Sequence, residues 1–325
     1  MFVEAVIGLA SFIAVLLALD LLYRKKTQIN GSHAIVTGGS SGIGRALAVQ
    51  LAQQGASVTL LARNKAKLEG ARQQVEKHLQ PGRKVSVFSV DLCQSVEAVQ
   101  KVIDEACLAL GPVNLLFNCA GYAVCGVFED TRPEDFKNMI NTNYLGSVYP
   151  TYAVMKGMKK RGCGHVVFTS SIGGQFGIFG MSAYSGSKFA VRGFAECLYM
   201  EAKLYNVAVS VAFPPDTDTP GFENENKEKP EETKLICGSA GLFSPDQVAQ
   251  TILQGVKCRQ FLISCGVEGW AMKIVTCGAA PSTSWLDLIQ QISLMGLLRL
   301  VMVISATGFD KIVAQCKQKR TRISH

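Results

Sequence analysis

Short apolar runs alternate with longer amphipathic stretches along most of the chain, from residue 31 to about residue 256. The short runs are rich in β-branched residues, which is typical of buried strands, and the longer ones carry apolar residues at helical spacing. Strands are predicted at residues 33–39, 57–63, 84–92, 113–121, 165–171 and 207–215, and helices at 45–55, 65–79, 95–109, 133–160 and from 184 onward. This alternation predicts an α/β fold with a doubly wound parallel sheet of about seven strands.

The first part of the chain departs from this pattern. Residues 2–23 are apolar apart from Glu4 and Asp20, and the basic run Arg24, Lys25, Lys26 follows. As a helix, this segment would span roughly 33 Å, about one hydrocarbon core. It lacks the positive charge that precedes the apolar run of a cleaved signal peptide. A membrane anchor is therefore predicted, with the N-terminus in the lumen and the rest in the cytosol. The two acids leave a helix lying on the membrane surface as the alternative.

The last part is also apolar and shows no clear strand. Residues 261–280 and 284–309 each contain charged residues, so neither is a clean spanning segment. Helices in the membrane interface, a shallow hairpin and a buried helix in an oligomer interface all fit. The predicted organisation is a membrane anchor over 1–26, an α/β domain over 27–260 and a membrane-associated region with a basic tail over 261–325. The only strongly polar loop, residues 223–234, follows the sixth strand.

Composition narrows the function classes. The formal net charge is +8, but no basic run is interleaved with aromatic residues, so nucleic acid is not an expected partner. The basic residues cluster instead beside the apolar ends, where anionic lipid headgroups would suit them, or where they would form a solvated tail. The 11 cysteines show no Cys-x-x-Cys pair and only four histidines accompany them, which argues against a zinc site and a disulfide framework.

A glycine-rich loop, TGGSSGIG at 37–44, lies between the first predicted strand and the first helix. A tight turn there brings the backbone close to a pyrophosphate at a helix N-terminus, where free N–H groups favour anions. The same residues fit a G-x-S-x-G hydrolase elbow, with Ser40 as nucleophile. That alternative needs a positioned histidine downstream, and neither His78, His165 nor His325 lies in a suitable loop. A Rossmann-type nucleotide site is therefore predicted.

The residues after the second strand indicate which nucleotide binds. NAD-binding domains place an acid against the ribose 2′-hydroxyl at this point. Here the stretch is ARNKAK, with Arg63 and, one turn later, Lys67. Two cations suit a 2′-phosphate, so NADPH is predicted as the cofactor. Asp91, at the end of the third strand, could accept a hydrogen bond from the adenine amine or cap a helix.

The stretch YSGSK at 184–188 places a tyrosine and a lysine four residues apart. On a helix, these two side chains lie on one face. A neighbouring ammonium favours the phenolate, so Lys188 is expected to lower the pKa of Tyr184 and make it a usable acid. A lone pair at this spacing is weak evidence, because it arises in many helices by chance.

Other motifs in the sequence support a catalytic role for Tyr184 and Lys188. TGGSSGIG, NCAG at 118–121, NYLG at 143–146, the serines 170 and 171, and YSGSK follow one another in the order and approximate spacing of the short-chain dehydrogenase/reductase family. The chain resembles this family over residues 31 to about 260. The stretches NYLGSVYP, FEDT and PPDTDTPGF resemble more narrowly a subgroup of membrane-bound reductases that act on a long-chain amino ketone in sphingolipid synthesis at the endoplasmic reticulum.

The resemblance implies roles for particular residues. Tyr184 protonates the carbonyl oxygen, Lys188 holds the nicotinamide ribose, and Asn143 holds a water that passes protons to Lys188. Ser171 or Ser170 orients the substrate oxygen. The implied nucleotide contacts come from Gly38, Ser40, Ser41, Gly42, Ile43, Gly44, Arg63, Lys67, Asp91, Leu92, Asn118, Ala120, Gly121, Tyr184, Lys188 and Thr219.

One stretch departs from the family pattern. The family usually carries Pro-Gly after the sixth strand, whereas this chain has Pro214-Pro215, followed by Asp216. Proline removes an N–H donor and fixes φ, so the local loop must differ. The loop from Thr219 to Lys234 is expected to cover the substrate. Its acids Glu223, Glu225 and Glu228, with Asp216 and Asp218, are candidates to pair with an ammonium headgroup, or form a solvated acidic loop.

These features predict a membrane-attached, NADPH-dependent ketone reductase without a metal. Its expected substrate is a long-chain amino ketone, its membrane that of the endoplasmic reticulum, with the catalytic domain facing the cytosol, and a homo-oligomer is expected. Steroid, retinal and 3-ketoacyl-CoA reductases are the alternatives within the family. A nucleotide-binding scaffold without chemistry is the alternative outside catalysis, and the intact Asn, Ser, Tyr and Lys set speaks against it.

Overall fold

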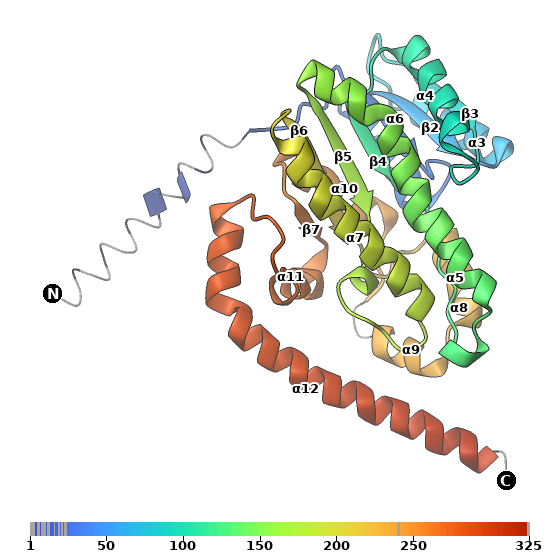
Figure 1. Cartoon of the computed structure of the whole chain (residues 1–325), viewed down its shortest axis with the longest axis vertical. Coiled ribbons are helices and arrows are strands. Elements are labelled where there is room, and N and C mark those ends of the chain that lie inside the picture. Colours follow the sequence, from blue (N-terminus) through green and yellow to red (C-terminus); the bar gives the residue numbers. More distant parts are fainter. Residues whose placement is uncertain are drawn as a thin grey trace.

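The structure, a computed structural model, describes residues 25–238 and 241–323 together with scattered positions between 4 and 22. Its centre is a seven-stranded parallel sheet with strand order β3-β2-β1-β4-β5-β6-β7 (Figure 1). The strands are β1 (His33–Thr37), β2 (Ser57–Ala62), β3 (Val85–Ser89), β4 (Leu115–Asn118), β5 (Gly164–Thr169), β6 (Val207–Phe213) and β7 (Leu262–Ser264). The predicted doubly wound α/β sheet is confirmed.

Helices cover both faces of the sheet because the central strands are apolar on both sides. All five residues of β1 are buried, and they alternate between two cores: Ala34 and Val36 face one, and Ile35 faces the other. The first core is closed by α2 (Gly42–Gln53), α3 (Lys65–Glu76) and α10 (Pro245–Lys257). The second is closed by α4 (Val96–Leu110), α6 (Gly146–Arg161) and α7 (Ser182–Lys203). Such continuously apolar strands are typical of parallel sheets with two covered faces.

The predicted helix at 133–160 contains an interruption. α5 (Pro133–Met139) runs into a π-helical turn, η2 (Ile140–Leu145), before α6 begins. Asn143 lies in this turn and is buried. Single π-turns inside helices often mark functional positions. The remaining short turns are 3₁₀ helices, η1 (Phe128–Asp130) and η3 (Ile172–Gly174).

Two features of the C-terminal part differ from the prediction. The polar stretch 223–234 is not a loop but forms most of two helices, α8 (Pro220–Glu228) and α9 (Glu231–Cys237). The sequence shows no clear strand beyond residue 256, yet β7 pairs with β6 from Leu262 to Ser264 and completes the predicted seven strands. The strand was missed because it is three residues long, too short for a periodic signal. α11 (Gly266–Val275) follows it and packs beside the sheet.

The last element, α12 (Trp285–Ile323), is a single helix of 39 residues. It is long and apolar enough to cross a membrane, with a mean hydropathy of 1.9 over its most apolar window. The stretch 284–309 therefore lies within one helix that runs through without a turn, and a hairpin of 261–280 and 284–309 could turn only between α11 and α12 (Figure 1). The predicted anchor at 2–23 lies mostly outside the described residues and stays a prediction.

Candidate active site

A cavity of about 760 Å³ lies at the carboxyl ends of the strands, where the order of the sheet reverses between β1 and β4. Crevices at such switch points are the usual ligand sites of doubly wound sheets. The cavity wall brings together most of the residues predicted from the sequence, although they are spread from residue 38 to residue 219. They are Gly38, Ser40, Ser41, Gly42, Ile43, Gly44, Arg63, Lys67, Asp91, Leu92, Ala120, Gly121, Ser170, Ser171, Tyr184, Lys188 and Thr219.

The glycine loop forms one end of this cavity. Gly38 has a φ of +65°, and a Cβ atom there would lie 2.9 Å from the backbone N and Cα of Ala120. Thr37 holds the two loops together, since its Oγ1 accepts hydrogen bonds from the N–H groups of Cys119 and Ala120 at 3.0 and 3.1 Å. α2 then begins at Gly42, and its N-cap residue Ser41 makes no side-chain cap. The first N–H groups of α2 are thus left for an anionic ligand such as a pyrophosphate.

Cations line the cavity next to this loop. Arg63 and Lys67 both contribute to the wall, and neither forms an ion pair with any residue that the structure describes. Asn64 between them caps α3 and accepts a hydrogen bond from the N–H of Lys67. Asp91 lies in the wall and its Oδ1 accepts from the N–H of Cys93 at 3.0 Å. The residues present therefore fit a dinucleotide, with the free N–H groups of α2 available to its pyrophosphate.

Tyr184 and Lys188 lie one turn apart near the start of α7. Lys188 Nζ donates a hydrogen bond to the carbonyl of Thr169 at 2.9 Å and lies 5.7 Å from the centre of the Tyr184 ring. Burial raises the pKa of Tyr184, and a side-chain hydrogen bond with Ser171 opposes this rise. Burial also lowers the pKa of Lys188 to about 8. The pKa of Tyr184 therefore lies above its usual value and not below it as expected, because burial disfavours the charged phenolate.

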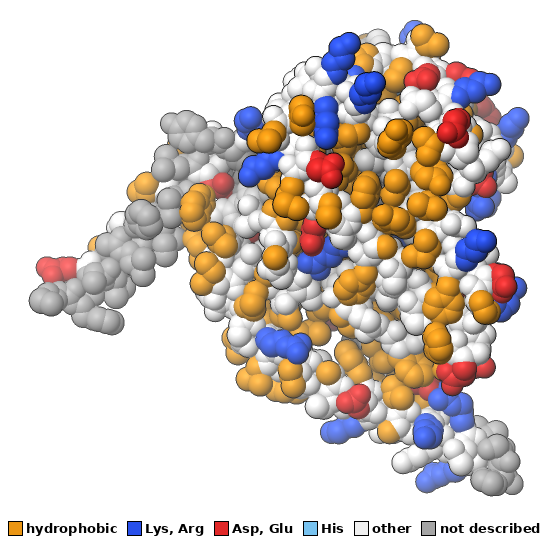
Figure 2. Space-filling view, in the orientation of Figure 1, with side chains coloured by type: hydrophobic (Ala, Val, Ile, Leu, Met, Phe, Trp, Pro, Cys, Tyr) orange, Lys and Arg blue, Asp and Glu red, His pale blue; other side chains and the backbone are white. Residues whose placement is uncertain are grey.

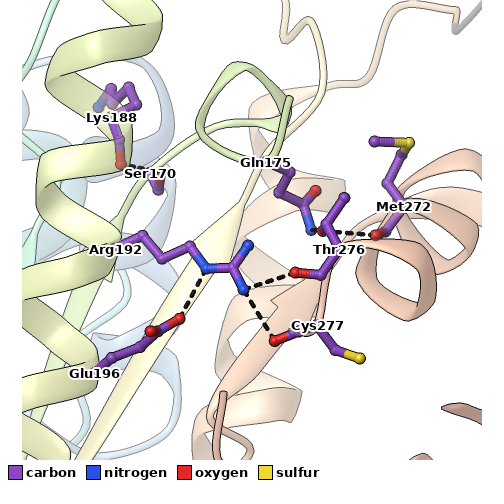
Figure 3. Close-up of polar contacts among 8 residues, drawn as sticks. All are labelled: Ser170, Gln175, Lys188, Arg192, Glu196, Met272, Thr276 and Cys277. Carbon is purple, nitrogen blue, oxygen red and sulfur yellow. Dashed lines mark hydrogen bonds and ion pairs between the residues drawn. The ribbon is translucent and has the colours of Figure 1, made fainter. Parts of the chain in front are cut away.

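The two serines after β5 differ in their contacts. Ser170 Oγ donates to the carbonyl of Lys188 at 3.0 Å, so this hydroxyl joins β5 to α7 (Figure 3). Ser171 instead caps the η3 turn, where its Oγ accepts from the N–H of Gly173, and it shares a hydrogen bond with Tyr184. Ser171 is therefore the serine whose hydroxyl lies beside the phenol, and Ser170 has a structural contact.

Two predicted residues lie behind the wall and do not line the cavity. Asn143 Nδ2 donates to Ser187 Oγ and to the carbonyl of Tyr122, and its Oδ1 accepts from the N–H of Tyr122. Its relay to Lys188 stays a prediction. Asn118 is buried at the end of β4 and donates to Thr151 Oγ1 on α6 at 3.0 Å. Its side chain therefore fixes the loop that follows β4, and Ala120 and Gly121 supply the lining.

A polar group on α7 ties this helix to the end of α11 (Figure 3). Arg192, one turn after Lys188, donates to the carbonyls of Thr276 and Cys277 at 2.7 and 3.1 Å and pairs with Glu196 at 2.9 Å. Gln175 donates to Thr276 Oγ1 at 3.2 Å. A guanidinium at a helix C-terminus also interacts favourably with the helix dipole. The catalytic helix, the loop after Ser171 and α11 are thus held in one arrangement.

The other end of the cavity is built by helices from the second half of the chain. Its apolar lining comes from the loop before α7 and from α8, α9, α11 and α12. These residues are Phe176, Ile178, Met181, Phe222, Ile236, Ala271, Met272, Val301, Met302 and Phe309. The charged residues in this part of the wall are Asp216, Glu225 and Glu268. An apolar space bordered by carboxylates suits a long-chain ligand with a positive charge.

Of the five acids expected near the headgroup, only two line the cavity. Asp216 and Glu225 do, whereas Asp218, Glu223 and Glu228 are exposed. Asp216 and Glu225 share a counter-ion, Lys229, which the sequence analysis did not predict. Lys229 Nζ lies 2.8 Å from Glu225 Oε1 and 3.6 Å from Asp216 Oδ2, and its side chain is 1% exposed. No sequence pattern distinguishes this lysine from its solvated neighbours. The three groups carry one net negative charge when all are ionised.

Comparisons with known proteins agree with this geometry. The family model for short chain dehydrogenases matches residues 32–230. The chain is 45% identical to 3-ketodihydrosphingosine reductase of Bos taurus, over 99% of this chain and 98% of that protein. It is 46% identical to 3-dehydrosphinganine reductase of Danio rerio, over 92% and 91%.

A solved structure shows the same fold. Levodione reductase has a TM-score of 0.64 and 24% identity, and the match covers 70% of this chain and 90% of that one. At this identity the likeness concerns the fold alone. The family match and the curated relatives concern the sequence itself. The chain therefore belongs to the short-chain dehydrogenase family, whose members are oxidoreductases that use a nicotinamide cofactor.

Proposed function

We propose that this protein reduces 3-ketodihydrosphingosine to dihydrosphingosine with NADPH. The observation that carries the proposal is one cavity that joins Tyr184, Lys188 and Ser171 to an apolar space bordered by Asp216 and Glu225. A ketone reductase needs the first group, and a long-chain amine needs the second. The names of the curated relatives support the same substrate, as does the resemblance of NYLGSVYP, FEDT and PPDTDTPGF.

The side chains divide the reaction between them. When bound, NADPH supplies the hydride that reduces the carbonyl carbon. Ser171 orients the carbonyl oxygen, and Tyr184 transfers its phenolic proton to that oxygen, which yields the secondary alcohol. The raised pKa keeps Tyr184 protonated at neutral pH, which is the form that reduction requires. Lys188, with its pKa lowered to about 8, can return a proton to Tyr184 near neutral pH.

Arg63 and Lys67 favour NADPH over NADH in this proposal. Both line the nucleotide end of the cavity, and no acid lies between them in the sequence. Guanidinium groups bind phosphate through paired, charge-assisted hydrogen bonds. Gly38 and the N-terminus of α2 would hold the pyrophosphate, and Thr219 and Gly121 border the space between this end and Tyr184.

The alternatives within the family fit the cavity less well. A 3-ketoacyl-CoA carries several negative charges, and the carboxylates of Asp216, Glu225 and Glu268 would repel them. Steroids and retinal carry no charge, so they would leave the carboxylates in the wall without a ligand partner. A reaction of the purified protein with NADPH and each of these four carbonyl compounds tests the proposal. Oxidation of NADPH and mass spectrometry of the product should show reduction of 3-ketodihydrosphingosine, and its absence would contradict the proposal.

We also propose that the protein works at the cytosolic face of the endoplasmic reticulum membrane, where its substrate would be dissolved in lipid. α12 supports attachment because none of its most apolar window is buried. The basic residues after the first apolar segment support a cytosolic catalytic domain. Protease protection of sealed microsomes tests the orientation, since a cytosolic domain would be digested without detergent. The homo-oligomer stays a prediction.

A further inference from the structure

Both ends of α12 form polar contacts with the folded domain. Near its start, Asp287 Oδ1 lies 2.8 Å from Lys273 Nζ of α11, and Trp270 Nε1 donates to Gln290 Oε1 at 3.2 Å. Near its end, Lys319 Nζ lies 2.9 Å from Glu231 Oε1 of α9, and Arg320 pairs with Glu232, whose side chain is fully buried. The elements that hold α12 are therefore α11 and α9, and both also line the cavity.

Between these two sets of contacts, one side of α12 faces the domain. Its partly buried positions recur every three or four residues, the spacing of one helix face. They include Leu294, Leu298, Met302, Ser305, Phe309 and Ile312, and the buried Cys316 continues the same face. Met302, Ser305 and Phe309 from this face line the cavity that also contains Tyr184, as does their neighbour Val301. α12 thus closes the apolar end of the cavity.

The opposite side of α12 is apolar and exposed. Ile292, Leu297, Val303 and Ile304 are 75%, 64%, 45% and 62% exposed. Figure 2 shows hydrophobic side chains along the lower left of the molecule, where α12 lies, and basic side chains near its C-terminal end. The helix has the length to cross a membrane, but both of its ends contact the same folded domain. It therefore lies along the domain, with one face on the cavity and the other turned outward.

We propose that Met302 and Phe309 form the wall against which the alkyl chain of the substrate packs, so that α12 selects substrates by chain length. The inference rests on the proposed function, because it takes the ligand to be a long-chain ketone. Each methylene group that the cavity buries favours binding by about fourfold. A wall that stops the chain ends this gain at a set length, because further methylenes stay in water or do not fit.

The test uses the full-length protein in detergent micelles and a series of 2-amino-3-ketones that differ only in chain length. Met302→Trp adds bulk to the cavity face of α12, and Val303→Trp adds the same bulk to the next residue on the exposed face. We expect the loss of kcat/KM in Met302→Trp to grow with chain length and to reach about tenfold. This is the effect expected if three to four methylene groups of the substrate each lose about half of their burial. Phe309→Ala should shift the optimum to longer chains, and Val303→Trp should leave the profile as it is.

Two outcomes would contradict the proposal that Met302 and Phe309 limit the chain length. If Met302→Trp lost the same factor of kcat/KM at every chain length, Met302 would not contact the alkyl chain. NADPH binding and an unchanged melting temperature would show that the variant is folded. The same profile change in Val303→Trp would mean that both faces of α12 contact lipid, as in a helix that crosses the bilayer. Failure of the proposed function looks different, since the wild type would then reduce no member of the series. In that case thermal stabilisation by long-chain amino alcohols, compared in Met302→Trp and Val303→Trp, still tests the wall.

Discussion

The two ends of the cavity are built in different ways. The nucleotide end consists of loops that follow β1, β2, β3 and β4, and its close contacts are largely backbone contacts, such as those between Gly38 and Ala120. The substrate end consists of side chains from α8, α9, α11 and α12, which are far from those strands in the sequence. One end is therefore fixed by the sheet, and the other by helices that are joined by ion pairs such as Lys273–Asp287 and Arg320–Glu232.

This difference teaches where specificity can change. A backbone cradle needs glycine at a few positions and tolerates little, since a Cβ atom at Gly38 would overlap Ala120. The helical end can change its lining residue by residue while the sheet stays the same. Tyr184, Lys188 and Ser171 lie where the two ends meet. Substitutions at the junction should abolish chemistry, those at the nucleotide end should change the cofactor, and those at the far end should change the substrate.

The largest effect is expected at the junction. Tyr184→Phe keeps the buried ring but removes the only proton that the phenol could give to the developing alkoxide. We expect kcat to fall by about 10²–10⁴-fold, whereas NADPH affinity, measured by fluorescence titration, should stay nearly the same. A variant that keeps more than a few per cent of its activity would remove Tyr184 from this role. Ser170→Ala and Ser171→Ala form a matched pair, and the greater loss of kcat should occur at Ser171.

A second substitution separates the nucleotide end from the rest. Arg63→Ala removes a guanidinium from the wall beside α2. Losing charge-assisted phosphate contacts should lower kcat/KM for NADPH by about 10- to 100-fold, at ~1.5–3 kcal/mol per charged hydrogen bond. The value for NADH should hardly change. Equal kcat/KM for both cofactors in the wild type, or an unchanged ratio in Arg63→Ala, would contradict the assignment.

The same contrast explains what the sequence could predict. Strand-turn-helix order and TGGSSGIG located the nucleotide end because its contacts depend on local backbone and chain order. YSGSK located the junction because both residues lie on one helix. The directions of pKa change at Tyr184 could not be predicted, since burial of the phenol depends on packing by distant elements.

The substrate end of the cavity was harder to predict from the sequence, because it too depends on the packing of distant elements. Of five candidate acids in one segment, the structure brings only Asp216 and Glu225 to the cavity, and their orientation depends on how α8 packs. Lys229 looked like any lysine of a polar stretch until α8 placed it beside Glu225. The apolar stretch 261–309 gave length and composition but not its division into β7, α11 and α12, because the three-residue β7 pairs only with β6, which lies about 50 residues earlier in the chain.

A smaller effect should mark the headgroup. Glu225→Gln removes one carboxylate from the wall, while Glu228→Gln makes the same change on the exposed side of α8. We expect Glu225→Gln to raise KM for 3-ketodihydrosphingosine by about tenfold, the value of a weak charged hydrogen bond, and to affect a long-chain 3-ketone without the amino group much less. Glu228→Gln should change neither. Equal changes for the two ketones in Glu225→Gln would place ammonium recognition elsewhere.

The smallest effect on chemistry is expected from the predicted membrane anchor, residues 1–26. Removing residues 1–26 should weaken membrane attachment but leave kcat/KM unchanged on a substrate held in detergent. The cut preserves Thr27, whose N–H donates to the carbonyl of Lys257 at 3.0 Å and whose Oγ1 lies 2.8 Å from His165 Nδ1. It removes the exposed hydrogen bond from Lys25 to Asn206 and the one from Ser284 Oγ to Asp20 Oδ2 at 3.5 Å, and neither contact lies within a strand, so the sheet should stay intact. Flotation with liposomes measures attachment. If the truncated protein floats as fully as the intact chain, the outer face of α12 is the main contact with lipid. If activity on detergent-held substrate falls with attachment, the first segment acts on the catalytic domain itself, and its role is not that of an anchor alone.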